Sequence, residues 1–454
     1  MRAGIGALAA ALLLASGLAV SGPAGTARAE ADPTTASSPV RVLERTQLTP
    51  RTLRLTIATD AFTAPAPVEV TLPVGYDADP QRRWPVTYYL HGADHDETTF
   101  RDSYDGEALT TGFGSIVVSP RGDVGFWSDW FSQATGPHDY ETFVIDQLVP
   151  LIDATFRTEA DRAHRAVMGE SMGGFGVMAY AARHPDLFAA AASLSGGVDS
   201  NLPASVAAIT AMPALQGQPP GSIFGDRLTQ EVRWRGSNPA DLVGNLRGVD
   251  LQLFTGNGLY DPTHGETLAE ASAGCVLEGV VIRPTSVSLH QLLLDRGIAH
   301  RWVDLPWGCH GVTLFQHEIR QALPQIAAVF ARPGPAPTQF DHRSIDPVID
   351  VWGWTIEADA DRELEFLDLT GAGRGGLSMA GSGATTVTTA SYFAGIATVS
   401  VTVEGVTTQV QPDPAGRITF EVDLGPANRT QAHQVGAVTT VHTADVHFTA
   451  GPAS

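Results

Sequence analysis

The sequence predicts an α/β fold with a mostly parallel sheet, followed by a small β-sandwich. In the first two thirds of the chain, short buried strands alternate with segments of helical periodicity, as in 165–169 followed by 173–183. A Pro-rich stretch at 332–337 is typical of a stiff linker. Beyond about residue 341, apolar and polar residues alternate with period two, as in 418–424, which indicates half-buried antiparallel strands.

The elements follow in order along the chain. Buried runs predict strands at 53–59, 68–73, 85–90, 115–119, 165–169, 188–194, 251–255 and 301–305. Helical spacing of apolar residues predicts helices at 140–156, 173–183, 286–295 and 314–330, the first of them despite Pro150. Strands and helices that alternate in this way favour a sheet covered by helices on both faces.

The first residues have the pattern of a secretory signal. Arg2 provides a positive start, Ile5–Val20 is an apolar run shorter than a comfortable membrane span, and Ala27-Arg28-Ala29 matches a cleavage site. An uncleaved N-terminal anchor is the alternative. We therefore expect a signal peptide at 1–29 and export from the cell. The remaining units are expected at 30–331 for the α/β domain, 332–340 for the linker and 341–454 for the β-sandwich.

Charge and composition exclude some classes of function. The 454 residues carry a formal net charge of -21. An acidic surface repels phosphate backbones, so nucleic acid is not expected as a partner. Neither an H-E-x-x-H motif nor a cysteine cluster is present, so no metal or other cofactor is expected.

The strongest chemical signal is Gly169-Glu170-Ser171-Met172-Gly173, placed between a predicted strand and a predicted helix. A serine hydroxyl becomes a nucleophile when a sharp strand-to-helix turn exposes it beside a base. The two glycines are explained by the lack of room for side chains at this turn. The motif in this context predicts Ser171 as the nucleophile of an α/β-hydrolase fold.

At this point the chain resembles a known family. The segment 165–197, with its His-Pro-Asp-Leu-Phe and Ser-Leu-Ser-Gly-Gly steps, is similar to the esterase D family of α/β-hydrolases. That family includes formylglutathione hydrolases, feruloyl esterases and the secreted antigen-85 mycolyltransferases. Matches at 127–130, 140–143 and 256–258 look most like the mycolyltransferase branch. The resemblance covers about residues 45–330 and implies an acyl ester substrate, with a lipid or a cell-wall glycolipid as candidates.

A histidine late in the domain is needed as the base. His310 lies in a Gly-flanked loop between the last predicted strand and the last helix, and the resemblance places the family's catalytic His there. His317 is a rival inside the helix, where a packed or solvated role is expected. His290 and His300 fit no motif.

Two carboxylates compete for the role of the acid that orients the base. Asp261 lies close behind a predicted strand, which is the usual position in this fold. Glu278 resembles the acid of the mycolyltransferases, and 310 − 278 = 32 residues separate it from the base. We favour Glu278 and keep Asp261 as the alternative.

Two backbone N–H groups should form an oxyanion hole. One belongs to Met172, the residue after the nucleophile. The resemblance assigns the other to Ala93, in the loop where His91 is expected to order the backbone rather than titrate. Trp127 and Trp130, with Phe126 and Phe131, either line the substrate cleft or pack the loop. His91 and Asp94 of the oxyanion loop are further candidates for contact with the substrate.

The chain has only two cysteines, Cys275 and Cys309. The first lies about one helical turn before Glu278 and the second is adjacent to His310. If Glu278 and His310 are in contact, as the resemblance implies, the two sulfurs should also be close. We therefore predict a disulfide that braces the acid against the base, and two separate buried thiols are the alternative.

Three functions are compatible with these residues. Ester hydrolysis through an acyl-enzyme is favoured over transfer of the acyl group to a sugar or lipid hydroxyl. In the mycolyltransferase branch an Arg stands in the oxyanion loop at the position of Asp94, and an aromatic residue lies two positions after the base, where this chain has Val312. Asp94 reverses the charge and removes the donors that would bind a polyhydroxy acceptor. A catalytically inactive binding protein is the third hypothesis. The oligomeric state is left open.

Overall fold

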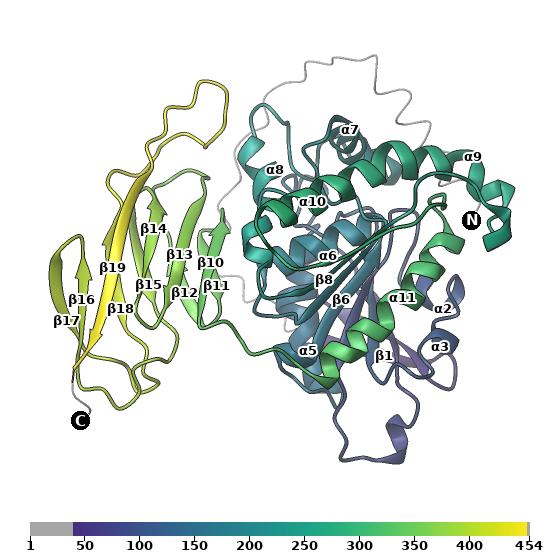
Figure 1. Ribbon diagram of the computed structural model, residues 1–454, viewed down its shortest axis with the longest axis horizontal. Coiled ribbons are helices and arrows are strands. Elements are labelled where there is room, and N and C mark those ends of the chain that lie inside the picture. The colour runs from purple at the N-terminus through teal and green to yellow at the C-terminus, as the bar shows by residue number, and fades with distance from the viewer. Residues whose placement is uncertain (1–39, 452–454) are drawn as a thin grey trace.

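The computed structural model describes residues 40–451. The N-terminal part is built on one nine-stranded sheet in the order β1-β2-β3-β5-β4-β6-β7-β8-β9 (Figure 1). The strands from β5 to β9 in this order run parallel, and β1, β2 and β3 extend the sheet antiparallel. Their bounds are Arg41–Gln47 (β1), Thr52–Ala58 (β2), Ala66–Thr71 (β3), Val86–Leu90 (β4), Ile116–Pro120 (β5), Arg165–Glu170 (β6), Ala190–Leu194 (β7), Asp250–Thr255 (β8) and Arg301–Asp304 (β9).

Helices cover both faces of this sheet, as the alternation of elements predicts. The α-helices are Thr99–Asp102 (α2), Gly106–Leu109 (α3), Tyr140–Thr142 (α4), Val149–Thr155 (α5), Met172–Arg183 (α6), Pro203–Ala211 (α7), Glu231–Ser237 (α8), Leu268–Val276 (α9), Arg283–Asp295 (α10) and Val312–Ala331 (α11). Along β4, Tyr88 and Leu90 belong to the core beneath α6 and α10, whereas Tyr89 belongs to the core beneath α11. The period-two alternation of the strand thus divides the apolar residues between the two layers. This architecture is the predicted α/β-hydrolase fold.

Several elements differ from the sequence-based expectations. β1 was not expected, because its side chains are nearly all exposed and carry no buried pattern. The expected helix at 140–156 is present, but its middle part, Phe143–Leu148, is a π-helical segment. A second π-helical segment, Leu277–Ile282, joins α9 to α10. Such insertions occur frequently at functional sites.

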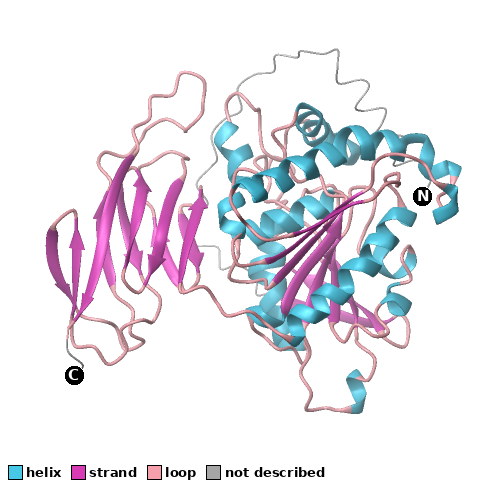
Figure 2. Cartoon of the chain, in the orientation of Figure 1, coloured by secondary structure: helices cyan, strands magenta, loops and turns pink. Residues whose placement is uncertain are grey.

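In the C-terminal part, residues 339–451 contain strands joined by loops and no helix (Figure 2). A six-stranded sheet in the order β10-β13-β14-β19-β16-β17 and a four-stranded sheet in the order β11-β12-β15-β18 enclose one apolar core. All of their pairings are antiparallel, as in the predicted sandwich. The strands are Gln339–Ser344 (β10), Val348–Val351 (β11), Trp354–Glu357 (β12), Leu367–Gly373 (β13), Gly376–Gly381 (β14), Ala384–Thr388 (β15), Val399–Val403 (β16), Val406–Val410 (β17), Thr419–Asp423 (β18) and His442–Ala450 (β19).

The two parts are in direct contact. The Arg183 guanidinium at the end of α6 pairs with Asp346 at 3.0 Å. Asn245 exchanges two hydrogen bonds of 2.9 Å with the backbone of Arg343 in β10. Ile345 is buried against the α/β part and belongs to its core. The sandwich is therefore docked on the α/β part by both polar and apolar contacts.

The expected signal peptide and the question of a membrane span concern different parts of the chain. The predicted signal peptide at 1–29 lies outside the described residues. Within residues 40–451, no helix is long and apolar enough to cross a membrane.

Candidate active site

The carboxyl ends of four neighbouring strands meet at one edge of the sheet. Leu90 of β4 pairs with Gly169 of β6, and Glu170 of β6 pairs with Leu194 of β7. Phe254 of β8 in turn pairs with Leu194. The residues that directly follow these strands are therefore neighbours in space, and in open α/β sheets this edge is where ligands bind.

Ser171 lies on the sharp turn between β6 and α6. Its backbone has φ 56° and ψ −119°, a strained conformation for a residue with a side chain. A Cβ on Gly169 would lie 2.3 Å from the Leu90 carbonyl oxygen, and one on Gly173 would lie 1.9 Å from it. Both glycines are thus required because the end of β4 leaves no room for a side chain at either position.

His310 contacts Ser171 directly. Its Nε2 lies 2.8 Å from the Ser171 Oγ, and its Nδ1 lies 2.6 Å from the Glu278 Oε2. His310 lies in the loop between β9 and α11 and is almost fully buried. With Nδ1 protonated toward the carboxylate, Nε2 is free to accept the serine proton. The structure thus brings together Ser171, His310 and Glu278.

Glu278 is fully buried in the π-helical segment between α9 and α10. Its Oε1 accepts three hydrogen bonds, from the Ser195 hydroxyl at 2.9 Å, the Thr255 hydroxyl at 2.8 Å and the Gly256 N–H at 2.8 Å. These donors leave Oε2 for His310. A buried carboxylate that is satisfied on both oxygens holds one orientation.

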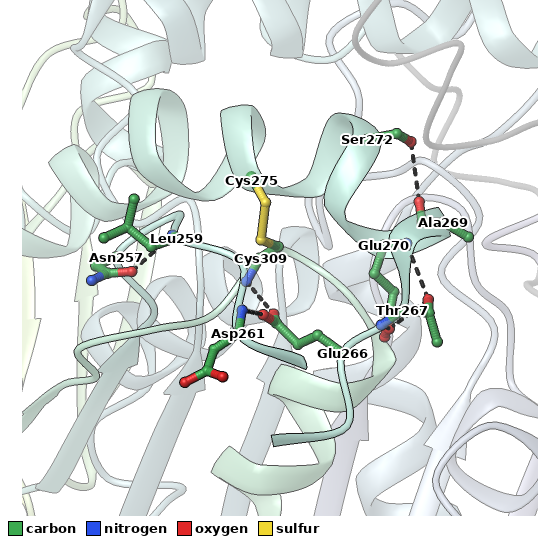
Figure 3. Close-up of a disulfide and its surroundings, with 10 residues drawn as sticks. All are labelled: Asn257, Leu259, Asp261, Glu266, Thr267, Ala269, Glu270, Ser272, Cys275 and Cys309. Atoms are coloured by element: carbon green, nitrogen blue, oxygen red, sulfur yellow. Dashed lines mark hydrogen bonds between the residues drawn. A yellow bond between two sulfur atoms is a disulfide. The ribbon is translucent and has the colours of Figure 1, made fainter. Parts of the chain in front are cut away.

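Asp261 does not join this group. Its carboxylate accepts hydrogen bonds from the Thr263 N–H at 2.9 Å and the Thr263 hydroxyl at 2.6 Å, and it pairs with His264 at 3.1 Å. The hydrogen bonds from Thr263 lower the pKa of Asp261. Asp261 therefore caps the 3₁₀ turn Pro262–His264, and its side chain points away from the disulfide loop that precedes His310 (Figure 3).

The other histidines considered for the role of the base make different contacts. His317 packs against the Trp307 ring, with ring centroids 5.2 Å apart. His290 and His300 bond each other through ring nitrogens at 2.7 Å.

The loop after β4 is ordered around two candidate oxyanion donors. Met172 is the first residue of α6, so its N–H has no carbonyl within the helix to bond. The Gly92 N–H is occupied, because it donates to Glu170 at 2.7 Å, and the Ala93 N–H is the next one in the loop. His91 is buried, with Nδ1 2.7 Å from the Gly92 oxygen and Nε2 accepting from the Gly122 N–H at 2.9 Å. Burial lowers the pKa of His91, which suits a neutral ring that orders the loop.

Trp127 and Trp130, near this loop, have buried side chains that hydrogen-bond the backbone. Trp127 is fully buried, and its indole N–H donates to the His91 carbonyl at 3.2 Å. Trp130 is buried and donates to the Gly125 carbonyl at 3.2 Å. Of the two roles that the sequence leaves open for Trp127 and Trp130, both side chains therefore fit packing of the loop. Phe131, by contrast, is 44% exposed.

Three buried polar residues of this site were missed by sequence reasoning. They are Glu170, Ser195 and Glu318. One of them, Glu318, could have been noticed in the sequence as a single acid on the apolar face of a helix. In α11 it lies on the same buried face as Leu314, Phe315 and Ala322.

Glu170 connects the nucleophile turn to the oxyanion loop. Besides the Gly92 N–H it accepts from the Tyr89 hydroxyl and bonds the His95 Nδ1 at 2.8 Å. Burial alone would lower the pKa of His95, but the hydrogen bond and the charge of Glu170 outweigh it and raise the pKa. Asp94, beside this pair, is partly exposed, with its carboxylate 4.0 Å from the His95 Nε2.

The predicted disulfide between Cys275 and Cys309 is present (Figure 3). It joins the end of α9 to the residue before His310. The His310 N–H also donates to the Gly274 carbonyl at 3.0 Å, and a Cβ on Gly274 would lie 2.5 Å from the His310 oxygen. Glu266 accepts from the Cys309 N–H, which further orders this loop. The helix that carries Glu278 is thus tied to the loop that carries His310.

Removal of this disulfide should lower stability markedly. The bridge closes a loop across a separation of 34 residues. Loss of that constraint on the unfolded chain corresponds to about 3–4 kcal/mol. We expect a Cys275→Ala/Cys309→Ala protein to unfold at a lower denaturant concentration than the wild type in equilibrium unfolding. Reductant should destabilise the wild type and leave the double variant unchanged. Two free thiols in denatured, unreduced wild type would contradict the bridge.

Metal ligands do not gather in the part of the chain that the structure describes. Among residues 40–451, no group of three or more His, Cys, Asp or Glu side chains is placed to hold a metal ion.

Comparison with known proteins places the α/β part in a family. Residues 59–326 match the family described as putative esterase. The chain is 32% identical over 276 residues to Esterase Rv1288 of Mycobacterium tuberculosis, which covers 59% of this chain and 58% of that protein. It is 30% identical over 152 residues to the diacylglycerol acyltransferase/mycolyltransferase Ag85B of Mycobacterium leprae, covering 32% of this chain and 45% of that protein. The chain thus spans a little over half of the length of the esterase relative.

Among solved structures, Mycobacterium tuberculosis MPT51 aligns with a TM-score of 0.49 and 18% identity. The alignment covers 64% of this chain and 99% of that one.

Proposed function

We propose that this chain, which belongs to the putative esterase family, is an exported serine esterase that cleaves acyl esters through an acyl-enzyme. The observation that carries the proposal is the continuous hydrogen-bonded chain from the Ser171 Oγ through His310 to Glu278. Nucleophilic acyl transfer needs a serine on a sharp turn, a base beside it and a carboxylate behind the base. Here Ser171 is half-buried on the elbow, its Oγ lies 2.8 Å from the His310 Nε2, and the Glu278 carboxylate is buried.

In the proposed reaction, the Ser171 Oγ attacks the ester carbonyl carbon while His310 Nε2 takes the hydroxyl proton. The carbonyl oxygen becomes an oxyanion, which the N–H groups of Met172 and Ala93 stabilise. The C–O bond to the alcohol breaks, and His310 returns the proton to the leaving oxygen. Water then attacks the acyl carbon with His310 again as the base. The bond from that carbon to the Ser171 Oγ breaks, His310 returns the proton to the Oγ, and the free acid leaves. Glu278 stays ionised and stabilises the imidazolium.

The proposal includes export and a division into two units. The pattern of residues 1–29 supports a secretory signal, and a disulfide beside the site suits an oxidising compartment. Residues 30–331 would form the catalytic unit, 332–340 the linker and 341–454 the second unit. All site residues described above lie before the linker.

Hydrolysis rather than acyl transfer is proposed as the main reaction. Transfer requires a bound acceptor hydroxyl that outcompetes water, which needs a positioned pocket and excluded solvent. Two features that could build such a pocket in the resembling transferases are replaced here. Asp94, a partly exposed acid, occupies the position of a donor-rich Arg, and Val312 occupies that of an aromatic residue.

The balance between the two reactions can be measured directly. With a soluble acyl ester and excess trehalose, we expect free acid as the dominant product and little or no acyl-trehalose. The reason is that Asp94, in place of an Arg, has no N–H donors for the sugar hydroxyls. Products are quantified by mass spectrometry, with the Ser171→Ala protein as the blank. Dominant acyl-trehalose would replace hydrolase by transferase as the proposed function. A series of acyl chain lengths in the same assay would define the donor.

A further inference from the structure

A second buried carboxyl group lies behind Glu278. The Ser195 hydroxyl oxygen is 2.9 Å from the Glu278 Oε1 and also 2.9 Å from the Glu318 Oε1. All three residues are fully buried. Ser195 follows β7 directly and has φ 43°, so its backbone is held in the left-handed region. Glu318 belongs to α11, two turns after the loop that carries His310.

The single hydroxyl hydrogen of Ser195 cannot satisfy both Glu278 and Glu318 if both are ionised. A serine hydroxyl has one hydrogen, so it cannot donate to both acids at once. Glu278 must be ionised to face the His310 Nδ1–H, and it already accepts from Thr255 and Gly256. The remaining contact, between Ser195 and Glu318, is then a hydrogen bond only if Glu318 supplies the hydrogen.

The surroundings of Glu318 favour its neutral form. Its Oε2 is buried without a hydrogen-bond partner among the described residues, which would be costly for a charged group. Burial and the charge of Glu278 raise the pKa of Glu318 well above its ordinary value, and Glu170 adds to the effect. His310 is the titratable group on the far side of Glu278. Two bare carboxylates bridged by one hydroxyl would repel each other in this site.

We propose that Glu318 is a positioning residue that acts as a permanently protonated acid. Its carboxyl O–H donates a hydrogen bond to the Ser195 Oγ, so that the Ser195 hydroxyl hydrogen is directed at the Glu278 Oε1. The chain of hydrogen bonds then runs from Glu318 through Ser195, Glu278 and His310 to Ser171. The role in turnover rests on the proposed esterase function, whereas the protonation of Glu318 does not.

Infrared spectroscopy tests the protonation without any substrate. A neutral carboxyl group gives a C=O stretching band that a carboxylate lacks. We expect the wild-type protein at pH 8 to show such a band, and the Glu318→Gln protein to lack it. If the wild-type minus variant difference spectrum contains no neutral-carboxyl band, the proposal is wrong, whatever the enzyme hydrolyses. If the band is present but no ester is cleaved, the proposed function fails and the protonation stands.

Kinetics test the positioning role. Glu318→Gln replaces the hydroxyl donor by an amide N–H, so its kcat should stay within about threefold of the wild type. Glu318→Leu has no donor, and we expect kcat to fall about tenfold with KM unchanged. When the Ser195 hydroxyl no longer donates to Glu278 in the right direction, the negative charge of Glu278 is less neutralised and stabilises the His310 imidazolium more strongly. The acidic limb of the kcat/KM profile should therefore move to higher pH in Glu318→Leu and not in Glu318→Gln.

Two further variants separate positioning from stability. Ser195→Ala should lower kcat as much as Glu318→Leu does. The double variant should be no worse than either, because both substitutions interrupt the same series of hydrogen bonds. Glu365→Leu is a matched control: Glu365 is a buried acid bonded to the Ser382 hydroxyl inside the β-sandwich, so its loss should lower Tm and leave kcat unchanged. Equal kcat and pH profiles in wild type and Glu318→Leu would overturn the proposal, as would a Glu318→Gln protein as impaired as Glu318→Leu. If Glu318→Leu does not fold, Ser195→Ala with an unchanged kcat and pH profile decides against it.

Discussion

Replacement of Ser171 by alanine should abolish ester hydrolysis, with a loss in kcat of about 10⁶-fold. The substitution removes the Oγ that lies 2.8 Å from the His310 Nε2, so no acyl-enzyme can form. Alanine retains a Cβ and places the same demand on the positive φ of the turn, so the fold should be preserved. Hydrolysis of nitrophenyl esters measures the loss, and thermal unfolding tests the fold.

His310→Ala provides the partner measurement. Because nucleophile and base act as a unit, its loss should be nearly as large as that of Ser171→Ala, and the double variant should lose little more. A fluorophosphonate should label the wild type at Ser171, label His310→Ala slowly and leave Ser171→Ala unlabelled. Substantial turnover by either purified single variant would remove these residues from the proposed mechanism.

Glu278→Gln is expected to reduce kcat by about 10⁴-fold, although it only replaces one carboxylate oxygen by an NH2 group. The three donors at Oε1 will orient the amide carbonyl oxygen toward Ser195, Thr255 and Gly256. The amide nitrogen then faces the His310 Nδ1, where it donates a hydrogen bond. This stabilises the tautomer with the proton on Nε2, which cannot accept the proton of Ser171.

Asp261→Asn is the matched control for this change. Asp261 bonds Thr263 and His264 and has no contact with His310 among the described residues, so its variant should retain kcat within about threefold. Steady-state kinetics on one soluble ester suffice for both proteins. The reverse ranking, with Asp261→Asn the more impaired protein, would transfer the role of the acid to Asp261.

The main architecture follows from local sequence patterns. Short buried runs indicate the parallel strands, because helices cover both of their faces, and helical spacing indicates those helices, because each needs one apolar face for the core. The Gly-rich motif around Ser171 could be interpreted from the sequence alone, since the turn, the serine and the two required glycines are adjacent in sequence. Edge strand β1 was missed because an exposed strand leaves no such pattern.

By itself, the sequence determined the α/β sheet, the β-sandwich and the serine at the elbow, all of which depend on residues close together in the chain. Only the tertiary structure showed that the Glu278 carboxylate lies 2.6 Å from the His310 Nδ1, whereas Asp261 bonds Thr263 and His264. Both residues fit the sequence pattern of the acid, and they differ only in what they contact. The tertiary structure also decided that Trp127 packs in the core, and it revealed the acid Glu318 behind Ser195. The physical reason is that burial and hydrogen-bond geometry depend on strands and helices that are distant in sequence, here β7, β8, the π-helical segment and α11, which converge at one edge of the sheet.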